Sequence, residues 1–321
     1  MSFTAQVKDE LSRVDPPTQE EALSELSAMV RICGTLSFHG NGRYTLRVQT
    51  ETGSVARSLM QLIHNTLGLE TALTVRRSVQ RKSNNYLIEI ADQDQLGDDL
   101  ERLGIIAPGR GLTQGVPSQL IRTDDQRRAF LRGAFLAGGF VADPRGDFHL
   151  EICVTGDTFA QGIQEIASTL GASARLNHRR GAFAVYLKSY DDVKVLLEQM
   201  GATRSAASVE SVRELKSVKS AVNRQVNAEL ANERRASRSG ADQIHLIRRV
   251  QNEVGIARLP VALQEFCELR LRYPEMSLSD LGQLCNPCAS KSAMYHRVLR
   301  LQKIVSELDE KRSGAMISKN Q

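Results

Sequence analysis

The chain has 321 residues, of which 41% are hydrophobic and 5% aromatic, and its formal net charge is +5. This length predicts two or three domains with mainly aliphatic cores, and the mild basic excess is compatible with a nucleic-acid partner. The five scattered cysteines do not resemble a disulfide framework, and no stretch is apolar enough to span a membrane. Because the N-terminal residues also lack the features of a signal or transit peptide, we expect a cytoplasmic protein.

The sequence from residue 22 to residue 203 contains one pattern twice, after a short amphipathic helix expected within residues 1–21. In each copy, a strand-like run precedes an apolar helix that follows Thr-Gly and ends at Leu-Gly. A hairpin-like region and a second glycine-terminated helix come next. We therefore predict two copies of an αββαββα unit, at residues 22–104 and 126–203, joined by a connector at residues 105–125. The matching segments are 44–50 with 148–154, 52–68 with 155–171, 85–90 with 184–189, and the helices that end at Gly104 and Gly201.

Each copy begins with a helix, which is expected at residues 25–40 in the first copy and 126–143 in the second. The second helix contains three glycines among apolar residues at helical spacing. They are Gly133, Gly138 and Gly139. A glycine inside a helix costs roughly 1 kcal/mol relative to alanine, so it is favourable only where another backbone approaches closely. We therefore predict a tight contact with the small residues of segment 28–34, and a loop that interrupts the apolar segment is the alternative.

Residues 204–241 have few large apolar side chains and more Arg and Lys than acids, which predicts a basic helical linker between two domains. Such a helix could lie along DNA phosphates, with Arg224 as a candidate contact. The charge of this segment alone is equally compatible with a solvated spacer that contacts no DNA.

The last part of the chain, residues 242–310, has the pattern of an all-helical DNA-binding domain, and residues 311–321 are expected to be a disordered tail. A short serine-capped helix, a turn with proline and a second helix from Ser290 predict a helix-turn-helix. In that geometry the first residues of the second helix contact bases or phosphates, while Arg297 and Arg300 contact phosphates. The predicted DNA-binding residues are Ser290, Lys291, Ser292, Tyr295, His296, Arg297 and Arg300, together with Arg224 of the linker. An ordinary helical hairpin with a solvated basic face is the alternative.

Cys285 and Cys288 have the C-x-x-C spacing that is found in zinc sites and redox dithiols. His296 is the only nearby third ligand, and it belongs to the exposed face of the second helix. We therefore expect both cysteines to be turn and core residues, and we expect no bound metal and no cofactor.

The segment FLAGGFVAD at residues 135–143 resembles the LAGLIDADG helix of homing endonucleases. The resemblance implies that the two leading helices pack at the centre of a pseudo-symmetric αββαββα pair. In that family, the last Asp of each motif holds the divalent metal ion that cuts DNA. Asp143 stands at this position, but the first copy has no carboxylate near Phe38, and cleavage needs carboxylates from both helices. We therefore expect Asp143 to be a turn residue before Pro144, a relic metal position without a partner.

Together with the helix-turn-helix, these features resemble the WhiA family of transcription regulators of sporulation and cell division in Gram-positive bacteria. The most specific matches are residues 127–144, 223–232 and 277–301, although Ala293 and Tyr295 replace the Gly and Asn that are usual in the family. The resemblance implies an α+β fold with a duplicated αββαββα LAGLIDADG-like N-terminal domain, a helical linker and an all-α helix-turn-helix domain.

The resemblance further implies a sequence-specific DNA-binding regulator on the nucleoid, with a catalytically silent endonuclease-like scaffold. Its expected partners are double-stranded promoter DNA and either a WhiB-like iron–sulfur regulator or an RNA polymerase sigma factor, whose DNA-reading region the last module resembles. A metal-dependent LAGLIDADG endonuclease and a protein-interaction scaffold are the alternative functions. Basic residues of the strands and hairpins leave open whether the duplicated domain contacts DNA. They are Arg76, Arg77, Arg81, Lys82, Arg179 and Arg180.

Overall fold

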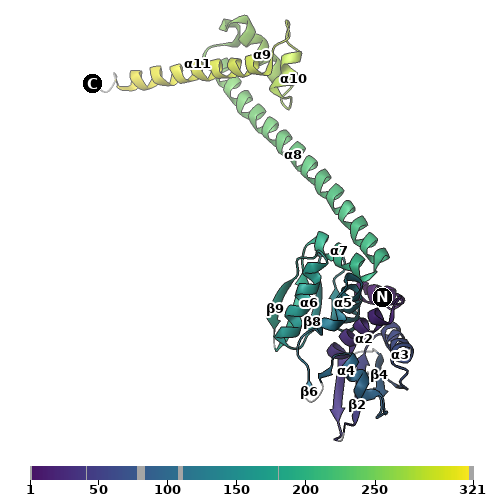
Figure 1. The fold of residues 1–321 in the computed structure, drawn as a ribbon. Coiled ribbons are helices and arrows are strands. Elements are labelled where there is room, and N and C mark those ends of the chain that lie inside the picture. Colours follow the sequence, from purple (N-terminus) through teal and green to yellow (C-terminus); the bar gives the residue numbers. More distant parts are fainter. Residues whose placement is uncertain (1, 41, 78–83, 108–110, 180, 318–321) are drawn as a thin grey trace. The chain divides into compact units, whose positions relative to one another are not determined.

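The chain divides into two units, residues 1–217 and 218–321. A computed structural model describes residues 2–40, 42–77, 84–107, 111–179 and 181–317. Helix α8 (Thr203–Glu253) contains the boundary between the two units (Figure 1). No helix of these described segments is long and apolar enough to cross a membrane.

The first unit contains one arrangement of helices and strands twice, which confirms the predicted duplication. The first copy consists of α2 (Gln19–Cys33), β1 (Gly34–Phe38), β2 (Tyr44–Thr50), α3 (Gly53–Leu67), β3 (Ala72–Arg77), β4 (Asn84–Ile90) and α4 (Leu96–Arg102). The second copy consists of α5 (Asp124–Gly138), β7 (Gly139–Val141), β8 (Leu150–Val154), α6 (Asp157–Thr169), β9 (Arg175–Arg179), β10 (Ala182–Leu187) and α7 (Tyr190–Met200). Both sheets are antiparallel and have the same strand order, β1-β2-β4-β3 and β7-β8-β10-β9.

Shorter elements complete this unit. Helix α1 (Phe3–Leu11) precedes the first copy. The connector between the copies contains β5 (Ile106–Ala107), β6 (Gly111–Leu112) and the short 3-10 helix η1 (Ser118–Leu120). The connector is therefore ordered where the structure describes it.

The helices of the first unit begin and end at the residues that local chemistry favours. The hydroxyl of Thr18 accepts the backbone N–H of Glu21 at the start of α2. Thr123 and Gln126 form a reciprocal capping box at the start of α5. Helices α3 and α7 end at glycines with φ of 69° and 100°, a left-handed conformation that other residues rarely adopt.

Helices α2 and α5 pack against each other at the centre of the first unit, as the glycines of α5 predict. A Cβ atom at Gly133 would lie closer than 3.0 Å to the backbone carbonyl oxygen of Glu25 on α2. Ala28 and Ala134 are fully buried in the same region. The two helix backbones approach so closely that only glycine fits at position 133.

Both leading helices begin and end earlier than expected, α2 at Gln19 instead of residue 25 and α5 at Asp124 instead of residue 126. Helix α2 ends at Cys33 and α5 ends at Gly138, and residues 34–38 and 139–141 are strands. At Gly139 the backbone turns to an extended conformation, and a Cβ atom there would clash with the ring of Phe135. Gly138 lies against the carbonyl oxygen of Cys153 on β8. It therefore permits a helix–strand contact in addition to the predicted contact with α2. The spacing of apolar residues does not reveal this change from helix to strand, because helical and alternating patterns cannot be distinguished over so few residues.

An ion pair that the sequence analysis does not predict lies between α2 and α5. Arg132 Nη2 is 2.6 Å from Glu25 Oε2, and the two side chains are 6% and 1% exposed. Burial raises the pKa of the Glu25 carboxyl to about 7, although the neighbouring guanidinium opposes this shift. The contact between the two copies therefore contains a carboxyl group that changes protonation near neutral pH.

The second unit packs three helices against the C-terminal part of α8. They are α9 (Val261–Arg272), α10 (Leu278–Gln283) and α11 (Lys291–Ile317), and the 3-10 helix η2 (Ile256–Arg258) precedes them. Each helix contributes fully buried side chains to one core, including Ile247 of α8, Phe266 of α9, Leu281 of α10 and Met294 of α11. This core is separate from that of the first unit.

Arg270 of α9 is 1% exposed in this second core. Its Nε donates to Gln243 Oε1 of α8 at 2.9 Å. Its Nη1 donates to three backbone carbonyls of the loop after α9, at distances of 2.6 to 3.2 Å. They belong to Tyr273, Pro274 and Met276. Arg270 therefore joins α8 to the loop that leads into the helix-turn-helix.

Both long helices of this unit extend beyond the expected boundaries. Helix α8 continues through residues 241 and 242, where the linker was expected to end. Helix α11 continues to Ile317, so residues 311–317 are helical and not the expected disordered tail, while residues 318–321 lie outside the described residues. The apolar residues Ile304, Val305 and Leu308 continue the helical spacing, and no proline or glycine precedes Gly314 to end the helix.

Candidate nucleic-acid interface

A tight turn at residues 284–290 joins α10 to α11. The hydroxyl of Ser277 caps α10 by accepting the backbone N–H of Asp280. The backbone N–H of Ala289 donates to the Gly282 carbonyl at 2.8 Å, and a Cβ atom at Gly282 would clash with the Ala289 carbonyl oxygen. Helix α10 and the end of the turn are therefore in backbone contact, which fixes where α11 begins.

Ser290 starts α11, because its hydroxyl accepts the backbone N–H of Ala293 at 3.2 Å. Met294, Val298 and Leu301 point into the core of the second unit and are buried. Six of the predicted DNA-binding residues are exposed within the first three turns of this helix. They are Ser290, Lys291, Ser292, Tyr295, His296 and Arg300, and we call them the α11 face.

Arg297 occupies a different position from the one expected for it. Its Nη1 lies 3.0 Å from Glu265 Oε2 of α9 and 3.3 Å from Cys285 Sγ, and its side chain is only 17% exposed. The other carboxylate oxygen of Glu265 accepts the backbone N–H of Asn286 at 2.8 Å. The hydrogen bond from Asn286, together with the guanidinium, lowers the pKa of Glu265. Arg297 therefore stabilises the turn through Glu265, and its side chain lies next to the buried side of α11.

Arg224 belongs to a separate surface of the second unit. It lies on an exposed stretch of α8, where its Nη1 donates to Ser220 Oγ at 3.0 Å. Gly240 is the residue at which the α8 backbone meets the loop after α9. Arg224 precedes Gly240 by about 24 Å of helix, at a rise of 1.5 Å per residue. It can contact only a part of a ligand that extends well beyond the α11 face.

Cys285 and Cys288 have different environments. The Cys285 thiol is buried, donates to the Leu281 carbonyl and lies 3.7 Å from Met294 Sδ. Burial raises the pKa of this thiol. Cys288 is exposed, and His296 lies on the α11 face. Within the described part of the chain, no group of three or more His, Cys, Asp or Glu residues is arranged to hold a metal ion.

The ends of α2 and α5, to which the endonuclease resemblance assigns metal-binding carboxylates, carry Cys33 and Gly138. Asp143 lies beyond β7 and not on α5. Its carboxylate accepts the backbone N–H of Arg145 at 3.0 Å and the Arg145 guanidinium at 2.5 Å. The side-chain hydrogen bond from Arg145 lowers the pKa of Asp143 to about 2. Asp143 is therefore the turn residue that the sequence predicts, and its charge is already paired.

The open face of the first sheet carries both charges. Arg76 of β3 is exposed on this face and Arg77 on the other, but Arg47 Nε of β2 lies 2.6 Å from Glu89 Oε2 of β4. Three of the other basic hairpin residues, Arg81, Lys82 and Arg180, lie outside the described residues, as does the side chain of Arg179.

The open face of the second sheet is aromatic near β7. Phe140 is 46% exposed, and its ring centroid is 6.3 Å from that of His149. The ring of His149 is in turn 6.2 Å from that of Tyr186 on β10. Glu151 of β8 lies between Phe140 and Tyr186 in the strand register. The exposed Arg175 of β9 is the register partner of Tyr186, and Lys188 Nζ lies 5.4 Å from the Tyr186 ring centroid, so this face combines aromatic and basic side chains.

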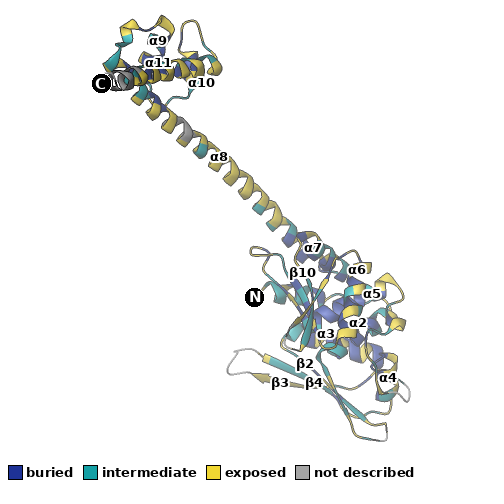
Figure 2. Cartoon of the chain, turned by 90° about the vertical axis from the view of Figure 1, so that its left-hand side faces the viewer, coloured by how far each residue is buried: buried dark blue, intermediate teal, exposed yellow. Residues whose placement is uncertain are grey.

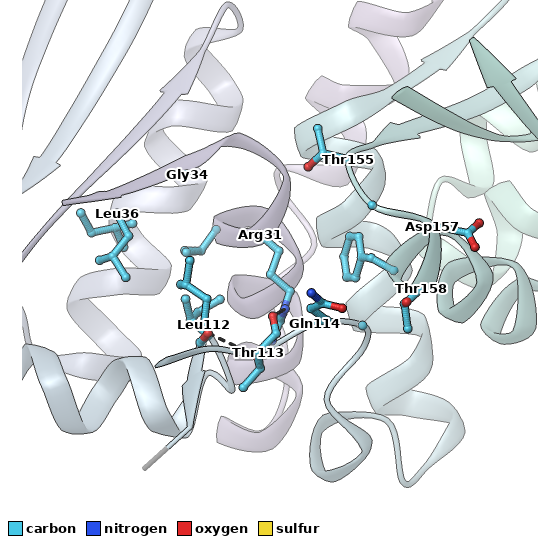
Figure 3. Close-up of a pocket in the computed structure, with 15 residues that line it drawn as sticks. Arg31, Gly34, Leu36, Leu112, Thr113, Gln114, Thr155, Asp157 and Thr158 are labelled. Atoms are coloured by element: carbon cyan, nitrogen blue, oxygen red, sulfur yellow. Dashed lines mark hydrogen bonds between the residues drawn. The ribbon is translucent and has the colours of Figure 1, made fainter. Parts of the chain in front are cut away.

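A cavity of about 440 Å³ opens between the end of α2, the connector and the start of α6 (Figure 3). Arg31 of α2 lies at its centre and donates to Thr113 Oγ1 at 2.7 Å and to the Gly104 carbonyl. Its guanidinium also lies 5.8 Å from the ring centroid of Phe159. Burial lowers the pKa of Arg31 to about 10. Arg31 thus holds the connector against the first copy, a role that the sequence analysis does not predict.

Three family models match consecutive parts of the chain. The model described as WhiA N-terminal LAGLIDADG-like domain matches residues 19–106, and that of the WhiA LAGLIDADG-like domain matches residues 127–219. The model of the WhiA C-terminal HTH domain matches residues 222–305. These matches cover the two copies and the helical unit.

Similar proteins and structures match over most of their length. A probable cell division protein WhiA of Clostridium novyi is 36% identical over 312 residues, which are 96% of this chain and 98% of the relative. A probable cell division protein WhiA of Heliobacterium modesticaldum is 39% identical over 305 residues, which are 95% of this chain and 96% of the relative. The crystal structure of full-length WhiA from Thermatoga maritima has a TM-score of 0.60 at 26% identity and covers 96% of this chain and 99% of its own.

Proposed function

The chain belongs to the WhiA family, and from this premise we propose that it is a sequence-specific DNA-binding regulator of transcription. The observation that carries the proposal is the α11 face, which presents six polar or basic side chains from the start of one helix. The turn before this helix is fixed by Arg297 and Glu265, so the side chains project from a rigid base.

In the proposed complex, the start of α11 enters the major groove of double-stranded DNA. Lys291 donates to a guanine edge, and the hydroxyls of Ser290 and Ser292 bond to bases or phosphates. Arg300, one turn beyond His296, holds a phosphate, and Arg224 of α8 adds a phosphate contact outside the groove. The sequence specificity then arises from few side chains, whereas the affinity depends strongly on salt.

The target that we propose is promoter DNA of sporulation and cell-division genes, and the place of action is the nucleoid. The relatives' name as cell division proteins supports this choice. As protein partner we propose a WhiB-like iron–sulfur regulator or an RNA polymerase sigma factor. The exposed aromatic side chains near Phe140 and Tyr186 support protein contact in the first unit.

We further propose that the first unit does not cut DNA. The ends of α2 and α5 lack carboxylates, and the Asp143 carboxylate is paired with Arg145, which supports a silent scaffold. Incubation of supercoiled promoter DNA with the protein and Mg²⁺ or Mn²⁺ tests this. Cleavage that disappears in the Asp143→Asn variant would establish the endonuclease function instead.

A gel-shift titration with promoter fragments selected by chromatin immunoprecipitation tests the regulator. Lys291→Ala should weaken specific binding about tenfold to a hundredfold, because a good base contact contributes about 1–3 kcal/mol. Arg300→Ala should weaken binding to all sequences and reduce the salt slope by about one unit. Lys303→Ala is the matched control, since it removes an exposed positive charge from α11 outside the α11 face. Equal loss in the control and in Lys291→Ala would contradict the proposed interface.

A further inference from the structure

The cavity around Arg31 is large enough for a small organic ligand. Its volume of about 440 Å³ lies within the range of ordinary ligand pockets, roughly 300–1,000 Å³. Thr113 of the connector accepts a hydrogen bond from Arg31. Two residues later, a Cβ atom at Gly115 would lie 3.1 Å from Thr158 Cγ2 of α6. The connector therefore brings Arg31 and the first turn of α6 to the same cavity, which lies within the first unit (Figure 3).

The positive charge of Arg31 is not balanced by an acid. The acceptors of its hydrogen bonds are neutral oxygens of Gly104 and Thr113, and its Nε is buried without an acceptor in the described part of the chain. Asp157 also lines the cavity, but its carboxylate accepts Gln161 Nε2 at 2.8 Å and points away from Arg31 (Figure 3). A cation that is removed from water without a counter-charge is unfavourable, so an anion in the cavity would stabilise it.

The start of α6 adds hydrogen-bond donors to the same cavity. Gly156 precedes the helix with a φ of 91°, a left-handed conformation that favours glycine, and no side chain caps the first turn. The backbone N–H groups of Asp157, Thr158 and Phe159 are therefore left without acceptors in the helix. Such groups, together with the positive end of the helix dipole, favour an anionic ligand.

The other side of the cavity is apolar. Leu36 of β1, Leu46 of β2 and Leu112 of β6 line it. Figure 3 shows Leu36 and Leu112 on the side of Arg31 that is away from Thr158. Leu112 is 70% exposed, so a ligand that covered it would remove a large apolar side chain from water. The cavity therefore suits a ligand with an anionic group at one end and an apolar group at the other.

We propose that this cavity binds a small organic anion, with a carboxylate or phosphate group between Arg31 and the first turn of α6 and an apolar body against Leu36 and Leu112. The ligand contacts both copies, because α2 and β1 belong to the first copy and α6 to the second. It binds the folded first unit and therefore stabilises this unit against unfolding. The proposal does not depend on DNA binding, since none of these residues belongs to the second unit.

A heteronuclear NMR titration of the full chain with four probes tests the site. Phenyl phosphate and phenylacetate carry the two kinds of anionic group, 2-phenylethanol is a neutral relative, and inorganic phosphate lacks the apolar body. At least one of the two organic anions should bind with a Kd on the order of 1 mM or below, and the amide signals of Thr113, Gly115 and Thr158 should shift. The neutral alcohol and inorganic phosphate should bind at least about tenfold more weakly, because each lacks one of the two groups. The tighter of the organic anions distinguishes a phosphate ester from a carboxylate as the ligand.

Two substitutions locate the anion. Arg31→Gln removes the positive charge and keeps an amide donor for the connector. Thr158→Asp places a negative charge at the second residue of α6, where the helix dipole favours an acid, so this variant stays folded. Each should weaken binding of the organic anions about tenfold or more. Ser54→Asp is the matched control and should bind as the wild type does, because Ser54 is the second residue of α3 and does not line the cavity.

Three results would overturn the proposal. One is that neither organic anion binds at about 10 mM, a concentration that detects even a weak ligand. Another is that 2-phenylethanol binds as tightly as the anions. The third is that anion binding is unchanged in Arg31→Gln or in Thr158→Asp, because the anion would then lie elsewhere.

Discussion

Arg297 Nη1 lies 3.0 Å from Glu265 Oε2, and this contact connects α11 to a residue 32 positions earlier in the chain. The same carboxylate accepts the backbone N–H of Asn286 in the turn. One side chain of α9 thus holds both the turn and the helix that follows it. The orientation of the α11 face depends on an acid that does not itself belong to that face.

Glu265→Gln and Arg297→Ala should therefore have the same effect on DNA binding. Each should lower the free energy of unfolding of the second unit by about 1–2 kcal/mol, because a charged hydrogen bond is lost. Each should also weaken promoter binding, with an unchanged salt slope in gel-shift titrations. If Arg297 contacted a phosphate directly, only its own substitution would weaken binding, and the salt slope would fall.

Arg270→Leu should strongly destabilise the second unit. It leaves three backbone carbonyls and Gln243 without their donor in a buried site, at a cost of about 3–5 kcal/mol. Amide hydrogen exchange of the full chain should show loss of protection in α9 to α11, with α2 and α5 unchanged. Arg272→Leu, two residues later on an exposed site, is the control and should have little effect.

Gly133→Ala should separate α2 from α5. The new Cβ would lie too close to the Glu25 carbonyl oxygen, and shifting the backbone should cost about 1–3 kcal/mol of unfolding free energy. Gly97→Ala on α4 is the matched control, since its Cβ would meet its nearest neighbour at 3.7 Å. Urea denaturation followed by circular dichroism compares the two variants. Equal midpoints would contradict the close contact.

The Glu25–Arg132 pair should make the stability of the first unit depend on pH. The folded-state pKa of Glu25 is raised from 4.5 to about 7, so the folded chain binds a proton more tightly than the unfolded chain. The contribution of this proton is fully present below about pH 4.5 and is lost as the pH rises through about 7.

Glu25→Gln removes this titrating group. The stability of the variant relative to the wild type should therefore rise between pH 5 and about 7.5. Hydrogen exchange of α2 and α5 at several pH values, corrected for intrinsic rates, measures the difference. Parallel pH profiles for the two proteins would show that Glu25 does not titrate in this range.

Sequence patterns alone predict the duplicated unit, the close approach at Gly133, and the helix-turn-helix with its serine-capped first helix and its second helix from Ser290. These features are local, because periodicity, caps and glycine act within a few residues of the chain. The exposed position of Arg300 also follows from local spacing, since Met294 and Val298 define the buried side of α11, whereas Lys291 shares their side and is exposed because it is the first residue of the helix.

The contacts of Arg297, Arg132 and Arg270 become visible only in the folded chain. From the sequence they are three basic residues on helices, and each could be solvated or bound to phosphate. Their roles depend on Glu265, Glu25 and the loop after α9, groups that folding brings within hydrogen-bond distance. The ends of α2 and α5 likewise depend on strand pairing with β2 and β8. The spacing of residues along a helix shows which side chains share a side. Whether a charged side chain contacts a ligand or stabilises the fold depends on its burial and on partners from distant parts of the chain.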